Sequence, residues 1–94
     1  MPVDSNYVQV PSGVGNTVVF GKPGARIGKV EVVVTGTGTV TIYDNAATNS
    51  GNILAAVPAS APVGYEIVVE LEVINGIVAA GSASSPVVNV TFSN

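Results

Sequence analysis

The sequence predicts an all-β fold, a seven- to eight-stranded antiparallel β-sandwich of the jelly-roll-like or immunoglobulin-like kind. Three observations support this prediction. The chain is rich in Val, Thr and Gly, which favour strands and turns over helices. Turn-forming residues recur about every 8–12 residues, the spacing typical of sandwich strands. Several runs alternate apolar with polar residues, as a strand with one buried face does.

The first 25 residues contain two weak strand signals, at 7–10 and 17–20. A length of 94 residues is typical of one domain, so we expect residues 1–94 to form a single β-sandwich. Residues 1–25 are either strands of that sandwich or an amino-terminal arm that lies on a neighbouring subunit.

The next segment, GKVEVVVTGTGTVTIYD, shows the alternation clearly. Its expected buried residues lie at every second position on either side of Gly36-Thr37-Gly38; they are Val30, Val32, Val34, Val40 and Ile42. The segment therefore predicts a hairpin with one buried face.

An oxygen-rich loop at 44–52 follows, before an uncertain strand at 53–57. Such a loop resembles a calcium site, but Asp44 is its only carboxylate and the EF-hand order of ligands is missing. Asn and Ser side chains more often bind their own backbone in turns. We therefore expect a turn without a metal.

The strand expected at 65–74 has one apolar and one acidic face. Ile67, Val69, Leu71 and Val73 share the apolar face, and Glu66, Glu70 and Glu72 share the face that must contact water. Asn75-Gly76 comes directly after this strand and favours a type I′ turn. We therefore expect 77–80 to return antiparallel, with Val73 opposite Val78.

The last strand is expected at 86–92, where Val88, Val90 and Phe92 point toward the core. These assignments make eight strands when both weak runs and the uncertain strand are counted.

The composition excludes several functions. Lys22, Arg26 and Lys29 are the only cations, too few for a dedicated nucleic-acid binder. No apolar run approaches the ~18 residues that a membrane-spanning helix needs. Residues 1–6 lack the basic start and apolar run of a signal peptide, so we expect the chain to stay in the cytoplasm where it is made.

The residues for catalysis are also missing. The chain has no His and no Cys, and three of its six acidic residues share one open strand face. The Gly-rich segment that ends at Gly28-Lys29 does not match the phosphate-loop pattern. The segment that begins at residues 13–15 does not match the dinucleotide-binding fingerprint. We expect no enzymatic activity, no metal and no cofactor.

Only 10% of the residues are charged while 47% are hydrophobic, so part of the surface is expected to face a partner. Tyr43, Val68, Ile74 and Ile77 fall on the side opposite the predicted core and form the candidate interface. The alternative is that a second sheet and its loops cover these residues within the same chain. Burial between subunits would make the protein a homo-oligomer.

The order of strands and loops over residues 26–93 resembles small bacteriophage virion proteins of the capsid decoration, or cement, type. The residues that carry the resemblance are Ile42-Tyr43-Asp44-Asn45, Ser50-Gly51, Asn75-Gly76-Ile77-Val78 and Val88-Asn89-Val90-Thr91-Phe92. It implies a homotrimer on the capsid surface that binds the major capsid protein and stabilises the phage head. Two alternatives remain: a tail or fibre module that binds a host-surface receptor or glycan, and a bacterial adhesin or immunoglobulin-like spacer.

Overall fold

The structure, a computed structural model, describes residues 6–13 and 15–94. Eight strands make up the fold, as predicted, and both weak runs and the uncertain run are among them. The strands are β1 (Asn6–Val10), β2 (Asn16–Phe20), β3 (Arg26–Val34), β4 (Val40–Asp44), β5 (Asn52–Val57), β6 (Glu66–Glu72), β7 (Ile77–Gly81) and β8 (Val87–Ser93).

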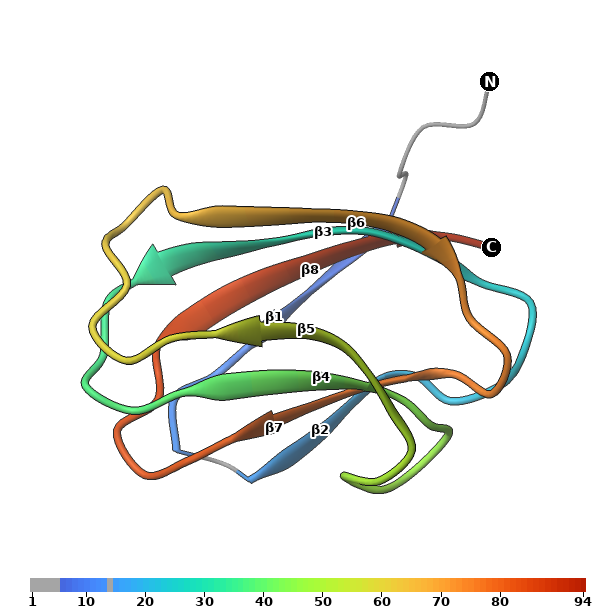
Figure 1. Ribbon diagram of the computed structural model, residues 1–94, viewed down its shortest axis with the longest axis horizontal. Coiled ribbons are helices and arrows are strands. Elements are labelled where there is room, and N and C mark those ends of the chain that lie inside the picture. The colour runs from blue at the N-terminus through green and yellow to red at the C-terminus, as the bar shows by residue number, and fades with distance from the viewer. Residues whose placement is uncertain (1–5, 14) are drawn as a thin grey trace.

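The strands form two four-stranded antiparallel sheets. Sheet A has the order β1-β8-β3-β6 and sheet B the order β2-β7-β4-β5; Figure 1 shows β3 and β6 above β4 and β7. Every connection except the β4–β5 loop crosses from one sheet to the other. This strand order is that of a jelly roll and differs from the immunoglobulin order, so the structure distinguishes the two predicted kinds of sandwich.

The core lies between the sheets and consists mainly of Val and Ile side chains. In β8, Val88, Val90 and Phe92 are buried at alternate positions, as predicted. The Phe92 ring packs against that of Phe20, with 5.5 Å between their centroids. Alternation places these residues inside because neighbouring side chains of a strand point to opposite faces.

The prediction of a hairpin over residues 28–44 is wrong. Its first strand, β3, lies in sheet A and its second, β4, in sheet B. The glycines between them serve close packing instead of a tight turn, since a Cβ at Gly36 would lie 2.5 Å from the Ser84 carbonyl oxygen. Val34, next to this crossing, is 54% exposed although the sequence pattern predicts it in the core.

The prediction of a hairpin at Asn75-Gly76 is wrong too. In the described part of the chain β6 pairs with β3 alone, whereas β7 lies between β2 and β4 in the other sheet, so Val73 and Val78 are not opposite each other. The apolar run of β7 suits a central strand and the Glu-rich β6 suits a sheet edge. Ile77 is therefore fully buried in the core, which contradicts its predicted place opposite the core.

β6 changes phase part-way along its length. Ile27 pairs with Leu71 and Lys29 with Val68, so two residues of β6 lie opposite one residue of β3. Glu70, one of those two, has a φ of 53°. Such a bulge shifts the alternation by one residue. Leu71 is consequently 52% exposed, and its prediction as a core residue is wrong.

The amino-terminal segment contributes strands to the sandwich from residue 6 onward. β1 pairs with β8 in sheet A, and β2 pairs with β7 in sheet B. Two parts of the predicted segments lie outside the described residues. They are residues 1–5, predicted to belong to strands or to an arm, and residue 14 in the glycine segment at 13–15.

Candidate interaction surface

Charge is concentrated on one side of the sandwich. Apart from Asp44, the charged residues that the structure describes lie on β3, on β6 and in the loop before β3; they are Lys22, Arg26, Lys29, Glu31, Glu66, Glu70 and Glu72. The strands of sheet B carry only Asp44, and that residue is 4% exposed. Sheet A is therefore charged, and sheet B offers an uncharged outer surface.

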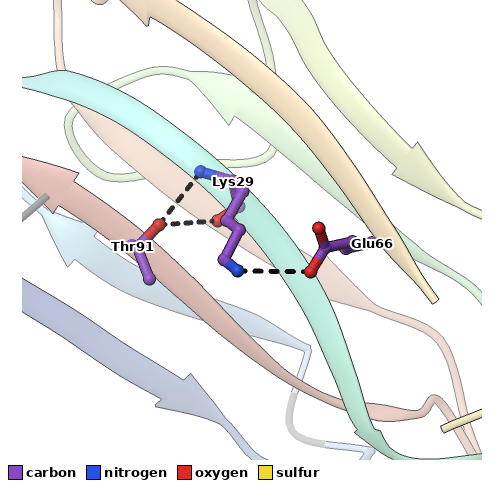
Figure 2. A network of polar contacts seen from close by, with 3 residues as sticks. All are labelled: Lys29, Glu66 and Thr91. Carbon is purple, nitrogen blue, oxygen red and sulfur yellow. Dashed lines mark hydrogen bonds and ion pairs between the residues drawn. The ribbon is translucent and has the colours of Figure 1, made fainter. Parts of the chain in front are cut away.

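The outer face of sheet A is well solvated. Figure 2 shows Lys29 between β8 and β6, with its Nζ 3.2 Å from Glu66 Oε2. The Thr91 hydroxyl accepts a hydrogen bond from the Lys29 backbone N–H and donates one to the Lys29 carbonyl. Arg26 forms a second ion pair with Glu70 at 3.4 Å. Both pairs are exposed, so each contributes at most about 1 kcal/mol to stability.

An apolar row crosses the outer face of sheet B. Val18 pairs with Val78, Val78 with Tyr43, and Tyr43 with Ile53. Residues paired across strands share a face of the sheet. Ile42, the neighbour of Tyr43, belongs to the core, so the row faces outward.

Exposure along this row rises from its centre to its ends. Val78 is completely buried although it lies outside the main core cluster, while Val18 is 49% and Ile53 62% exposed. A second row beside it is uncharged as well. We call the two rows together the sheet B face: Val18, Val78, Tyr43 and Ile53 in the first row, and Asn16, Ala80, Thr41 and Ala56 in the second.

Both edges of sheet B are also uncharged. β2 reads NTVVF and β5 reads NILAAV, and among the described residues each pairs with one neighbouring strand. Exposed edge strands are sites of association, and charged side chains are one of the means by which proteins block them. β6 has this protection from its three Glu residues, whereas both edge strands of sheet B lack it, as does β1 at the other edge of sheet A.

The four residues of the predicted interface do not form one surface. Tyr43 lies in the apolar row of sheet B. Val68, 63% exposed, lies opposite Lys29 in sheet A, and Ile74, 71% exposed, lies in the β6–β7 loop. Ile77 lies in the core. Sequence reasoning missed Val18 and Ile53, the exposed ends of the row that contains Tyr43.

Asp44 ties the end of β4 to the β6–β7 loop. Its carboxylate accepts hydrogen bonds from the backbone N–H groups of Ile74 at 3.0 Å, Asn75 at 2.7 Å and Gly76 at 3.3 Å. Burial alone would raise the pKa of Asp44, but these three donors outweigh it and hold the pKa below its ordinary value.

The loop after Asp44 binds its own backbone, as predicted. Asn45 Oδ1 accepts hydrogen bonds from the N–H groups of Ala47 and Thr48, both at 2.9 Å. Within residues 6–13 and 15–94, His, Cys, Asp and Glu form no group of three or more that would hold a metal ion. The side-chain oxygens of Asn45, Thr48 and Ser50 and the Asp44 carboxylate have hydrogen-bond partners within the chain.

A hollow of about 440 Å³ lies at one end of the sandwich and is broadly open to solvent; its lining consists of Gly24, Ala25, Arg26, Glu72, Val73, Ser93 and Asn94. The most exposed tyrosines do not gather at a binding site. Tyr7 lies on β1 at one edge of sheet A, and Tyr65 lies just before β6 at the other edge. In the described part of the chain, no helix is long and apolar enough to cross a membrane.

No protein-family model matches the sequence, and the searches of curated proteins and of solved structures find no match either.

Proposed function

We propose that the protein is a non-enzymatic structural protein of a bacteriophage virion, a decoration or cement protein that binds the capsid and stabilises it. The observation that carries the proposal is the uncharged sheet B face, opposite a sheet A that holds six of the eight charged residues that the structure describes. Such a division favours a protein with one face in water and the other against a partner.

The energetics of this face suit binding. Val18 and Ile53 are each about half exposed, so covering the rest of each side chain would contribute about 1 kcal/mol. No charged group would have to lose its water on the face, which keeps the cost of desolvation low. Binding through it should depend little on salt, because screening acts on charges.

Two further points support a virion role. The jelly roll is the architecture of many viral capsid domains, although it also occurs in lectins and cupins. Architecture alone does not determine function. The resemblance of residues 26–93 to decoration proteins adds the expectation of a homotrimer, of the major capsid protein as partner, and of a place on the capsid surface after synthesis in the host cytoplasm.

A matched pair of variants tests the face. Ile53 and Val68 are 62% and 63% exposed, on edge strands of opposite sheets. Ile53→Glu places a charge on the sheet B face and should abolish assembly, while Val68→Glu should leave it intact. Native mass spectrometry at tens of micromolar protein would measure oligomers, and equal behaviour of the two variants would contradict the role of the sheet B face.

The virion role needs a separate experiment. Purified protein is mixed with phage particles that lack it, and co-sedimentation is measured together with the temperature of genome release. Binding to the head with a raised release temperature is the expected result. Absence from the particle, or a location confined to the tail, would overturn the cement function; a tail location would favour a fibre module that binds a host receptor or glycan.

A further inference from the structure

The Asn75-Gly76 pair in the β6–β7 loop can undergo a spontaneous reaction. In a flexible chain, the backbone nitrogen of the Gly attacks the side-chain carbonyl carbon of the preceding Asn. A carbon–nitrogen bond forms, ammonia leaves with the amide proton, and a five-membered imide results. Water then opens the imide to aspartate or isoaspartate. Gly at the second position favours this reaction because no side chain hinders the attack.

The structure requires the reactive dipeptide to keep its Gly. Gly76 has a φ of 154°, and a Cβ there would lie 2.6 Å from the Phe20 carbonyl oxygen and 2.7 Å from that of Asn45. Any side chain at position 76 would therefore displace backbone atoms of two other segments. The same packing restrains the movement that the attack needs.

Asp44 restrains the attacking nitrogen directly. The Gly76 N–H is buried and donates to Asp44 Oδ1 at 3.3 Å, and the same carboxylate binds the Asn75 N–H at 2.7 Å. The Gly76 nitrogen must lose its proton to react, and a neighbouring negative charge opposes that loss. The hydrogen bonds also hold the backbone on both sides of the Asn75 side chain in place.

We propose that Asn75 is a deamidation site whose reaction is held back by Asp44. Deamidation requires the loop to leave the carboxylate, so its rate follows the fraction of molecules in which the loop is open. The product is a second carboxylate in the loop that Asp44 binds, and repulsion between the two opposes reclosure. The reaction would thus convert a reversible opening of the β6–β7 loop into a permanent one. This inference does not depend on the proposed virion function.

The test follows deamidation by mass spectrometry during incubation of the whole protein at mildly alkaline pH. A protease that cleaves after Glu releases residues 73–94, because Glu72 is the last Glu in the chain. Fragmentation of this peptide distinguishes Asn75 from Asn89, which lies in β8 and serves as the internal control. Wild type is compared with Asp44→Asn, which keeps the side-chain shape and removes the charge.

In the native wild type, Asn75 should deamidate at least about tenfold more slowly than in urea, and Asp44→Asn should lose most of that protection. The Val57→Ala variant controls for lower overall stability, because Val57 is a fully buried core residue that is distant from the β6–β7 loop in sequence. The Val57→Ala variant is incubated as many degrees below its own melting temperature as the wild type is below its own. Under these conditions Asn75 of the variant should deamidate as slowly as in the native wild type. Equal rates for native and unfolded wild type would overturn the proposal, as would equal acceleration by Asp44→Asn and Val57→Ala.

Discussion

Replacing Asp44 with Ala should destabilise the protein strongly, because one side chain binds three backbone N–H groups. The Gly76 N–H is buried, and leaving it unpaired costs about 1–3 kcal/mol. The N–H groups of Ile74 and Asn75 are partly buried and can regain water. Loss of their charge-assisted hydrogen bonds lowers the free energy of unfolding by a smaller amount. Part of the total loss is offset because the variant no longer buries a carboxylate. We expect a net loss of about 2–3 kcal/mol.

That loss is large for a chain of 94 residues, whose total stability is on the order of 5–14 kcal/mol. Urea unfolding followed by circular dichroism would measure it as a lower midpoint with an unchanged slope. Glu70→Gln is the control, since it removes the charge from an exposed ion pair and should change stability by less than about 1 kcal/mol. A loss for Asp44→Ala no larger than that of the control would refute the reasoning.

The contribution of Asp44 should also depend on pH in a defined direction. Its pKa is lower in the folded protein than its ordinary value, so the folded state favours the ionised form. The stabilisation is fully present above the unfolded-state pKa of about 4 and is lost as the pH falls through the folded-state pKa. The stability difference between wild type and Asp44→Ala should therefore stay constant from neutral pH down to about pH 5 and shrink below about pH 4. A difference that instead grows on acidification would show that the hydrogen bonds do not favour the carboxylate.

Two further predictions test the fold. Ile42→Ala should cost about 2–5 kcal/mol because Ile42 is fully buried, whereas Leu71→Ala should cost less than about 1 kcal/mol because Leu71 is 52% exposed. The reverse order in urea unfolding would show that the phase change in β6 is assigned wrongly. Gly76→Ala should destabilise more than Gly24→Ala, since both glycines have positive φ but only a Cβ at Gly76 meets backbone atoms within 3 Å. Equal melting temperatures for these two variants would mean that the packing around Gly76 yields at little cost.

Local patterns in the sequence were enough to predict the strands. The alternation of Val88, Val90 and Phe92 with polar neighbours places the right residues of β8 in the core, because side-chain direction within one strand repeats every two residues. The runs at 7–10 and 17–20 are likewise strands where the sequence signals them. The scarcity of charge was also visible, and it indicated that some surface would be uncharged.

Only the tertiary structure decided which strands pair. Gly36-Thr37-Gly38 and Asn75-Gly76 look like hairpin turns, yet both connect strands of different sheets. Pairing between distant strands outweighs the local preference of a turn, since each of the central strands β3, β4 and β7 bonds to two neighbours. The bulge at Glu70 likewise reverses the burial expected for Leu71.

For the sheet B face as well, the sequence predicted one part and the tertiary structure decided the other. Tyr43 was predicted to face away from the core from the alternation of its own strand, and it lies in the outward-facing row. The exposed ends of that row, Val18 and Ile53, lie 25 residues before and 10 residues after Tyr43 in the chain, and the register of sheet B brings all three into one row. The sequence determines which residues each strand can show on one side. Which of those residues become a common surface also depends on hydrogen bonds between strands that are far apart in the chain, such as β2 and β7, and local pattern does not encode them.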